Sequence, residues 1–211
     1  MKTLVQCDFD GTITEEDISF MLLDGFAQGD WRHLLQDYKE HKISVGHFNT
    51  QAFTMVKADR LTLLEAAKDK LKIRAGFHEL VTYCSRKGFR LVIVSNGLEF
   101  YIKEVLRELG LEKLEVHAAQ TQFCADGLKV QYIGTDGKQL DDGLKEACIK
   151  SFLKEGYRVI YIGDGDSDIR PARYAHQIFA TGELLTYCKE HNLKCKPFNS
   201  LNDVVEALKL L

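Results

Sequence analysis

The amino-acid sequence predicts an α/β fold with a Rossmann-like parallel sheet at its core. Three short apolar runs, residues 2–7, 90–94 and 157–162, have the composition of strands buried on both faces. Helical patterns lie between the runs, and each run ends in a polar cluster. Because ligands bind beyond the carboxyl ends of parallel strands, we expect the three polar clusters to converge on one crevice.

The segments between these strands have patterns of their own. Apolar residues recur at helical spacing over residues 98–109 and 144–155, and a glycine follows each pattern as a C-terminal cap. Alternating residues over 120–132 surround an Asp-Gly turn, which predicts a β-hairpin.

A long helical segment separates the first two polar clusters. Asp8 and Ser95 are 87 residues apart, which is far more than one β-α-β crossover requires. We therefore expect residues 16–73 to form a small helical cap domain, inserted after the first strand, and residues 1–15 and 74–211 to form the catalytic core.

Composition excludes several classes of protein. The chain has 211 residues, of which 45% are hydrophobic and 28% charged, as in an ordinary globular domain. Its formal net charge of −3, without a block of like charges, argues against nucleic acid and membrane surfaces as partners. No run approaches the roughly 20 apolar residues of a membrane span, so we expect a cytoplasmic protein. The six scattered cysteines favour neither a zinc site nor a disulfide framework.

Asp8 and Asp10 follow the first apolar run and can take two different roles in phosphoryl transfer. A turn at Gly11 can bring both carboxylates to one site. One carboxylate can attack phosphorus as a nucleophile, while its neighbour protonates the departing oxygen. The alternative is a solvent-exposed loop with a helix-capping residue, because Asp-x-Asp is common in turns.

Asp164, Asp166 and Asp168 form a second acidic cluster after the third apolar run. Several carboxylates around one crevice repel each other unless a divalent cation lies between them, and Mg²⁺ is the natural candidate. A calcium EF-hand is the competing interpretation. It fails because Ile169 and Ala175 stand where that loop needs Gly and Glu.

The remaining polar residues can bind phosphate. The Ser95 hydroxyl and the amides of Asn96 and Gly97 follow the second apolar run, although this tripeptide alone predicts only a turn. Lys145 begins the helix that leads into the third run, and its ammonium can offset charge on a transferring phosphoryl group. Among other lysines, Lys150 is the rival for this role and Lys138 a weaker one.

Together, four ordered groups of residues resemble the motifs of the haloacid dehalogenase superfamily. The groups are Asp8-Phe9-Asp10-Gly11-Thr12, Ser95-Asn96-Gly97, Lys145 and Gly163-Asp164-Gly165-Asp166-Ser167-Asp168. The resemblance spans the chain, since the helical insertion is similar to the cap of the phosphoserine phosphatase-like branch. It implies a phosphoric monoester phosphatase that acts on a small phosphorylated metabolite.

The resemblance also implies roles for the acidic residues. It makes Asp8 the nucleophile that forms an aspartyl-phosphate and Asp10 the general acid and base. Asp8, the backbone carbonyl of Asp10, and Asp164 would bind Mg²⁺. Asp168 would complete the acidic shell, directly or through water.

The same resemblance implies a phosphate-binding set. Ser95, Lys145 and the amides near Gly11, Asn96 and Gly97 would hold the phosphoryl oxygens, with Lys145 counted among the catalytic residues.

Two departures from phosphoserine phosphatases bear on the substrate. Those enzymes typically carry Glu where Asp17 stands and Ser-Gly-Gly where this chain has Ser95-Asn96-Gly97, which argues against phosphoserine. Within the branch, the chain is most similar to the members that act in methionine salvage. Asp17 itself either touches the substrate or caps a helix. Phosphotransfer to an acceptor alcohol and a non-catalytic module that binds a metal or a phosphorylated ligand remain alternatives.

Overall fold

The computed structural model describes residues 2–210, apart from the side chains of 69 and 70. The chain divides into two compact units. The first comprises Met1–Glu16, Lys72–Val94 and Lys145–Leu211, and the second comprises Asp17–Leu71 and Ser95–Leu144.

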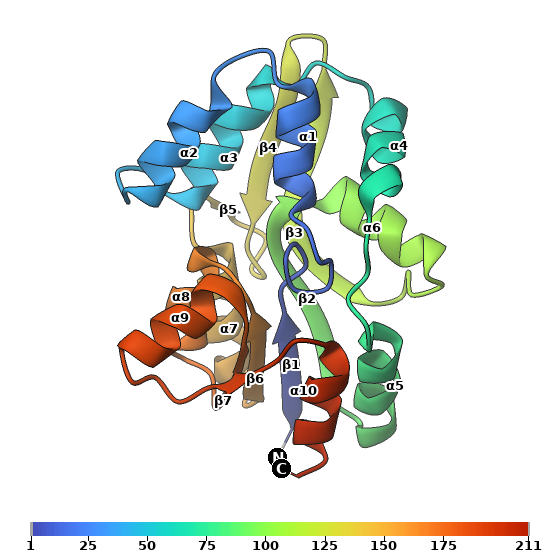
Figure 1. The fold of residues 1–211 in the computed structure, drawn as a ribbon, viewed down its shortest axis with the longest axis vertical. Coiled ribbons are helices and arrows are strands. Elements are labelled where there is room, and N and C mark those ends of the chain that lie inside the picture. The colour runs from blue at the N-terminus through green and yellow to red at the C-terminus, as the bar shows by residue number, and fades with distance from the viewer. Residues whose placement is uncertain (1, 211) are drawn as a thin grey trace. The chain divides into compact units, whose positions relative to one another are not determined.

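The first unit is built on the predicted parallel sheet. Its strands lie in the order β2-β1-β6-β7-β8, and each pairs with its neighbours in parallel (Figure 1). They are β1 (Thr3–Cys7), β2 (Arg90–Leu98, which belongs to the second unit from Ser95 onward), β6 (Arg158–Gly163), β7 (Gln177–Ala180) and β8 (Lys196–Pro197). The central strands are apolar on both faces because helices cover the sheet on both sides, as the sequence predicts.

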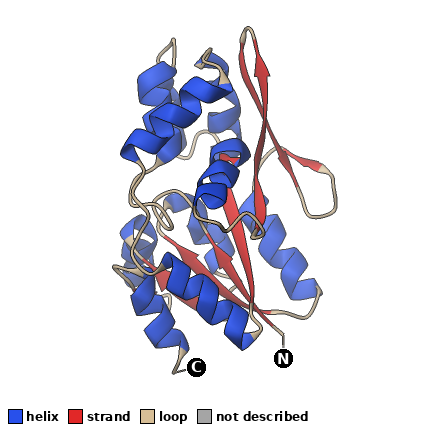
Figure 2. Cartoon of the chain, turned by 90° about the vertical axis from the view of Figure 1, so that its right-hand side faces the viewer, coloured by secondary structure: helices blue, strands red, loops and turns tan. Residues whose placement is uncertain are grey.

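Helices complete this unit, and Figure 2 distinguishes them from the strands by colour. They are α5 (Phe77–Lys87), α7 (Leu144–Lys154), η2 (Asp166–Asp168), α8 (Ile169–Ala172), α9 (Gly182–Glu190) and α10 (Leu201–Leu208). The pattern over 144–155 is confirmed as α7, and α5 packs against α10.

One detail of β2 differs from the prediction. The strand continues to Leu98, so Ser95, Asn96 and Gly97 lie in extended backbone rather than in a loop. The polar residues suggested a strand end. However, the carbonyl oxygen of Asn96 accepts hydrogen bonds from the side chains of Asn49 and Tyr132, which hold the backbone there.

The second unit combines helices with an antiparallel hairpin. Its elements are α1 (Ile18–Phe26), α2 (Trp31–Lys39), α3 (Val45–Ala52), η1 (Phe53–Met55), α4 (Arg60–Lys70), α6 (Glu99–Glu108), β3 (Glu115–Cys124), β4 (Gly127–Ile133) and β5 (Gln139–Leu140). The predicted hairpin is confirmed, because β3 and β4 pair antiparallel around Asp126-Gly127.

The inserted segment 16–73 is helical, as expected, and it packs with elements from beyond the insertion. Within the second unit, α3 and η1 contact β4, and α4 contacts α6. The division into a catalytic core and a cap of residues 16–73 stays a prediction. None of the described helices is long and apolar enough to cross a membrane.

Gly76 should be the glycine of α5 least tolerant of a side chain. Its φ is +93°, and a Cβ there would lie 2.7 Å from the Leu201 backbone carbon at the start of α10. Gly88, at the other end of α5, has φ +66°, and a Cβ there would meet no described atom within 4 Å. We expect Gly88→Ala to cost about 1–2 kcal/mol from backbone strain alone, and Gly76→Ala to cost roughly 1–3 kcal/mol more from overpacking. Urea unfolding of both variants checks this, and equal losses would contradict it.

Candidate active site

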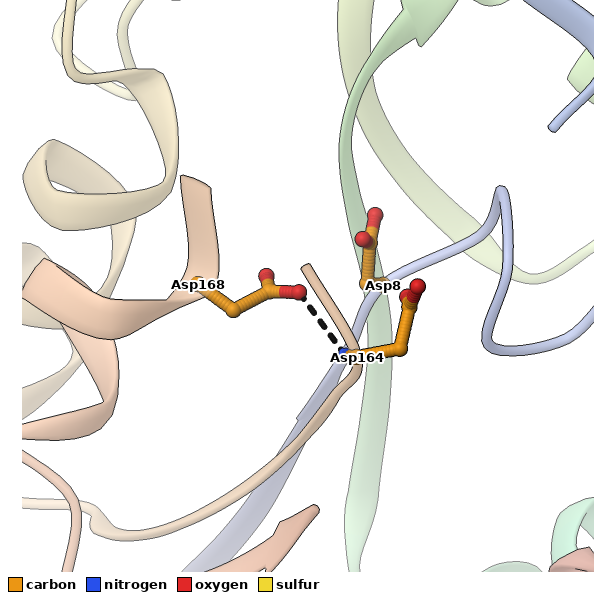
Figure 3. A group of neighbouring side chains, drawn as sticks. All are labelled: Asp8, Asp164 and Asp168. Carbon is orange, nitrogen blue, oxygen red and sulfur yellow. Dashed lines mark hydrogen bonds between the residues drawn. The ribbon is translucent and has the colours of Figure 1, made fainter. Parts of the chain in front are cut away.

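The acidic residues of the first unit gather at the carboxyl ends of β1 and β6. These strands are direct neighbours, with Cys7 paired to Ile162, so Asp8 and Asp164 extend from the same edge of the sheet. Asp168 returns to this edge from η2 (Figure 3). One ligand atom from each of the three carboxylates lies within 4.8 Å of the others, an arrangement that can hold a metal ion. Asp166 is not in this group.

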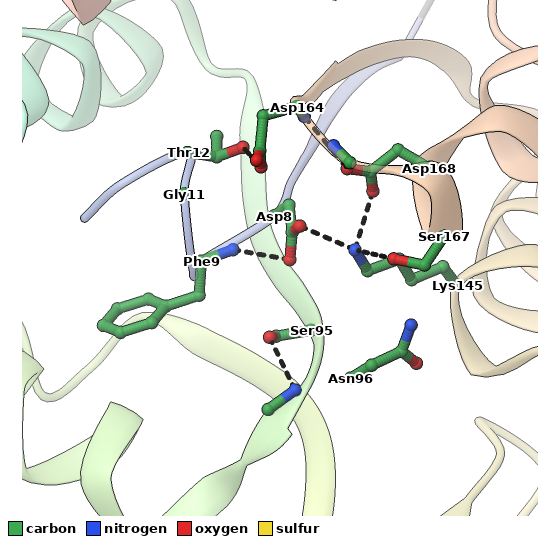
Figure 4. Close-up of polar contacts among 12 residues, drawn as sticks. Asp8, Phe9, Gly11, Thr12, Ser95, Asn96, Lys145, Asp164, Ser167 and Asp168 are labelled. Carbon is green, nitrogen blue, oxygen red and sulfur yellow. Dashed lines mark hydrogen bonds and ion pairs between the residues drawn. The ribbon is translucent and has the colours of Figure 1, made fainter. Parts of the chain in front are cut away.

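Lys145, at the start of α7, reaches into the acidic cluster. Its Nζ lies 2.6 Å from Asp8 Oδ2 and 2.7 Å from Asp168 Oδ1, and donates to Ser167 Oγ at 3.1 Å (Figure 4). Only 3% of its side chain is exposed. The ammonium is therefore shared between two buried carboxylates.

The two rival lysines lie elsewhere. Lys150 is 46% exposed and pairs with Glu146 one helical turn away, while Lys138 is 82% exposed beside Asp136. The structure thus brings Lys145, and neither rival, to the acidic cluster.

Asp168 is held on both carboxylate oxygens. Oδ1 accepts a hydrogen bond from the Tyr161 hydroxyl at 2.6 Å in addition to the contact with Lys145. Oδ2 accepts from the backbone amides of Asp164 and Gly165, each at 3.0 Å. A Cβ on Gly163 would lie 2.6 Å from the Asp168 carboxyl carbon, so this position needs glycine. Asp168 is consequently fixed in one orientation.

The electrostatics distinguish the two carboxylates that share Lys145. Burial raises the pKa of Asp8 well above its usual range, and the charge of Asp168 adds to this effect while Lys145 opposes it. For Asp168, burial acts in the same direction, but Lys145 and the hydrogen bonds from Tyr161 and Gly165 outweigh it and lower the pKa. Asp8 is therefore the carboxylate whose ionised form needs further positive charge.

Lys145 keeps its charge in this environment. Burial disfavours the ammonium form, but the charges of Asp168 and Asp8 outweigh burial and raise the pKa of Lys145. A permanent cation therefore faces Asp8 at neutral pH.

The loop after β1 packs closely on Asp164. The Thr12 hydroxyl donates to Asp164 Oδ1 at 2.7 Å. Gly11 has φ +75°, and a Cβ there would collide with the Asp164 carboxylate. Asp10 lies in the same turn and is half-buried. The loop after β1 can therefore pack against the Asp164 carboxylate only because residue 11 has no side chain.

The predicted phosphate-binding residues of β2 belong to the second unit. Ser95 Oγ accepts from the Gly97 amide at 3.0 Å (Figure 4). The carbonyl oxygen of Asn96 accepts from Asn49 Nδ2 at 2.9 Å and from the Tyr132 hydroxyl at 2.8 Å. The extended backbone at Asn96 is therefore anchored by side chains from α3 and β4.

Asp17 acts as a helix cap. Its Oδ1 accepts from the Phe20 amide at 2.8 Å, at the N-terminus of α1. This supports the capping interpretation of Asp17.

Comparisons with known proteins agree with this geometry. Residues 5–173 match the family of haloacid dehalogenase-like hydrolases. The chain belongs to this family. The match covers the end of β1, Lys145 and the second acidic cluster, and so includes every residue of the cluster just described.

Named relatives and solved structures are similar over nearly the whole length of this hydrolase. A 2-hydroxy-3-keto-5-methylthiopentenyl-1-phosphate phosphatase of Bacillus cereus is 27% identical, covering 100% of this chain and 98% of the relative. The enzyme of that name from Geobacillus kaustophilus is 29% identical, with 96% and 94% covered.

Among solved structures, a substrate-bound phosphoserine phosphatase has a TM-score of 0.71 at 19% identity, with 98% of each chain covered. Phosphoserine phosphatase from T. onnurineus has a TM-score of 0.72 at 20% identity, with 100% and 96% covered. These structures share the fold of the hydrolase.

Sequence reasoning gave no role to two residues that hold the site together. Tyr161 lies within an apolar strand, where its ring predicts only core packing, yet its hydroxyl bonds to Asp168. The sequence identifies Gly163 only as the first residue of a motif, and the structure shows that its lack of a Cβ makes room for the same carboxylate. Neither contact leaves a local signal, because the partner is several residues away.

Replacing Lys145 should destabilise this hydrolase far more than replacing Lys150. Lys145→Met leaves Asp8 and Asp168 buried without their cation, which costs about 3–5 kcal/mol. Lys150→Met removes a surface ion pair with Glu146 and a contact with the Tyr174 ring, and should change stability little. Chemical unfolding at neutral pH measures both. Equal effects would show that Lys145 does not hold the two carboxylates together.

Proposed function

We propose that this hydrolase is a Mg²⁺-dependent phosphatase of small phosphorylated metabolites and that Asp8 is its nucleophile. The observation that carries the proposal is the buried Asp8 carboxylate at the end of β1, paired with Lys145 inside a cluster that can hold a cation. A binding module has no need of a nucleophile held beside a fixed cation, so the geometry favours catalysis over the non-catalytic alternative.

The residues present fit Mg²⁺. With its carboxylates ionised, the group of Asp8, Asp164, Asp168 and Lys145 carries a net charge of −2, which one divalent cation would balance. Asp8 and Asp164 would bind the ion, with the carbonyl of Asp10. Asp168 already accepts on both oxygens, so it would act at the ion through water or by orienting its neighbours. A bound Mg²⁺ supplies positive charge that offsets the charge of the phosphoryl group.

The first half-reaction uses the two aspartates of β1 and its turn. An Asp8 carboxylate oxygen attacks phosphorus, and the bond from phosphorus to the ester oxygen breaks. Asp10 donates a proton to that departing oxygen, so the alcohol leaves neutral. Asp8 is then an aspartyl-phosphate. Lys145 favours the ionised form of Asp8 before attack, against the effect of burial, and stabilises the charge on the phosphoryl oxygens afterwards.

The second half-reaction returns the enzyme to its starting state. Asp10, now ionised, takes a proton from a water molecule, and the water oxygen attacks phosphorus. The bond between phosphorus and Asp8 breaks, which releases inorganic phosphate and the free carboxylate. Asp10 ends protonated, as it began.

We assign phosphate binding to Ser95, Asn96, Gly97, Gly11 and Lys145. Chain continuity supports the assignment for β2: Ser95 comes two residues after Ile93, which pairs with Cys7 immediately before Asp8. Main-chain amides and a hydroxyl are the donors that phosphate oxygens prefer.

For the substrate, we propose 2-hydroxy-3-keto-5-methylthiopentenyl-1-phosphate, an intermediate of methionine salvage. The relatives named for that reaction align over 100% and 96% of the chain. Action in the cytoplasm on a small metabolite is part of this proposal.

Two related activities are alternatives. The shared fold of phosphoserine phosphatases supports phosphoserine as the second candidate substrate. Transfer of the phosphoryl group from Asp8 to an acceptor alcohol would use the same first half-reaction. It would yield a new phosphoester in place of inorganic phosphate.

The proposal predicts Mg²⁺-dependent phosphate release that requires Asp8. Purified protein is assayed with the methionine-salvage phosphate, phosphoserine, sugar phosphates and nucleotides, with Mg²⁺ and then with chelator. We expect the highest kcat/KM for the methionine-salvage compound and a loss of at least about a thousandfold in Asp8→Asn. Asp126→Asn, in the exposed hairpin turn, is the matched control and should retain activity. Undiminished turnover in Asp8→Asn would exclude the mechanism.

A further inference from the structure

In the sequence, Arg74 follows the helical insertion and precedes α5. Its guanidinium group contacts the loop that follows β1. Nε donates to the carbonyl oxygen of Thr12 and Nη2 to that of Gly11, each at 2.7 Å. Nη1 donates to the carbonyl oxygen of Asn199 at 3.0 Å. These three hydrogen bonds end on main-chain carbonyls, so the guanidinium joins separate backbone segments of the first unit.

Other contacts fix Arg74 itself. Its backbone amide donates to the carbonyl of Ile13 at 2.8 Å, and the preceding Ile73 forms a β-bridge with Thr14. The guanidinium carbon lies 5.7 Å from the centroid of the Phe198 ring. The arginine therefore has a defined position from which to hold the loop.

The loop that Arg74 holds is connected directly to the acidic cluster. The carbonyl oxygen of Thr12 accepts a hydrogen bond from Arg74 Nε, and the Thr12 hydroxyl donates one to Asp164 Oδ1 at 2.7 Å. The Gly11 backbone lies against the same carboxylate with no room for a Cβ. A rotation of either peptide plane would break the hydrogen bond to Asp164 or press the backbone against it.

We propose that Arg74 is a positioning residue for the metal-binding part of the site. It fixes the peptide planes of Gly11 and Thr12, and through them the Asp164 carboxylate and the adjoining carbonyl of Asp10. The inference rests on the proposed Mg²⁺-dependent phosphatase function.

The planar fork of arginine explains why this position needs it. Two parallel N–H groups reach two successive carbonyl oxygens, which a single ammonium cannot do with the same geometry. Arg74→Lys therefore keeps the charge but loses the fixed spacing. Arg90→Lys is the matched control, because Arg90 lies on the same unit but contacts Glu155, Tyr157 and Phe152 instead of the loop.

The experiment measures Mg²⁺ binding to the full chain by calorimetry, kcat and KM with p-nitrophenyl phosphate, and the thermal midpoint. In Arg74→Lys we expect Mg²⁺ affinity and kcat to fall roughly 10- to 100-fold, as for other residues that orient metal ligands. Arg90→Lys should leave both unchanged. A merely structural role would lower the thermal midpoint without changing Mg²⁺ affinity in the folded protein.

A second variant tests the route through Thr12. Thr12→Val removes the hydroxyl that bonds to Asp164 and keeps the backbone that Arg74 contacts. The double variant Arg74→Lys/Thr12→Val should lose little more Mg²⁺ affinity than the weaker-binding single variant, because both changes break the same connection. Fully additive losses would overturn the inference. If Arg74→Lys does not fold, wild-type Mg²⁺ affinity in Thr12→Val would overturn it as well.

Asp8→Asn, measured alongside, separates the two proposals. If Asp8→Asn is inactive but Arg74→Lys binds Mg²⁺ normally, the proposed role of Arg74 is contradicted and the proposed function is not. Full turnover in Asp8→Asn would overturn the proposed function and this inference with it.

Discussion

The ammonium group of Lys145, shared between Asp8 and Asp168, is the interaction on which the site depends. Burying a carboxylate is costly unless a cation and hydrogen bonds compensate it, and here one buried cation serves two carboxylates. The arrangement joins the end of β1, the start of α7 and the segment after β6. Gln6 of β1 adds to it by donating to the carbonyl oxygen of Lys145 at 3.0 Å.

The parallel sheet makes this convergence possible. β1 and β6 are neighbours in register, so their carboxyl ends bring Asp8 and Asp164 together without long loops. Glycines at 11 and 163 then let carboxylates approach the backbone where any Cβ would collide. Strand ends and backbone amides thus hold the carboxylates of the acidic cluster in place. What it still requires is positive charge near Asp8, whose pKa is raised by burial.

Much of this arrangement is predictable from the sequence. The apolar runs give the strands, and the polar clusters after them give Asp8, Asp164 and Asp168 as one group. The choice of Lys145 over Lys150 rests on family resemblance, and the structure agrees because only the former is buried in the cluster. These predictions succeed because strand ends in a parallel sheet share an edge, whatever the intervening loops do.

The missed features all depend on contacts that form only when the chain folds. In the sequence, Tyr161 has the pattern of a core residue, and only the fold brings Asp168 to its hydroxyl. Nothing in the sequence distinguishes Arg74 from the other basic residues, and only the fold brings it to the loop after β1. The extended backbone at Asn96 in β2 is held by side chains from α3 and β4. The packing of α3 against β4 likewise depends on contacts between separate segments. Local sequence patterns do not predict such contacts.

The most direct test of this account is to trap the covalent intermediate. The protein is mixed with Mg²⁺ and p-nitrophenyl phosphate, quenched rapidly in acid, digested and examined by mass spectrometry. The account predicts one phosphoryl group on the peptide that contains Asp8, located on that side chain. Steady phosphate release with no phosphorylated peptide, or with the phosphoryl group on another residue, would contradict it.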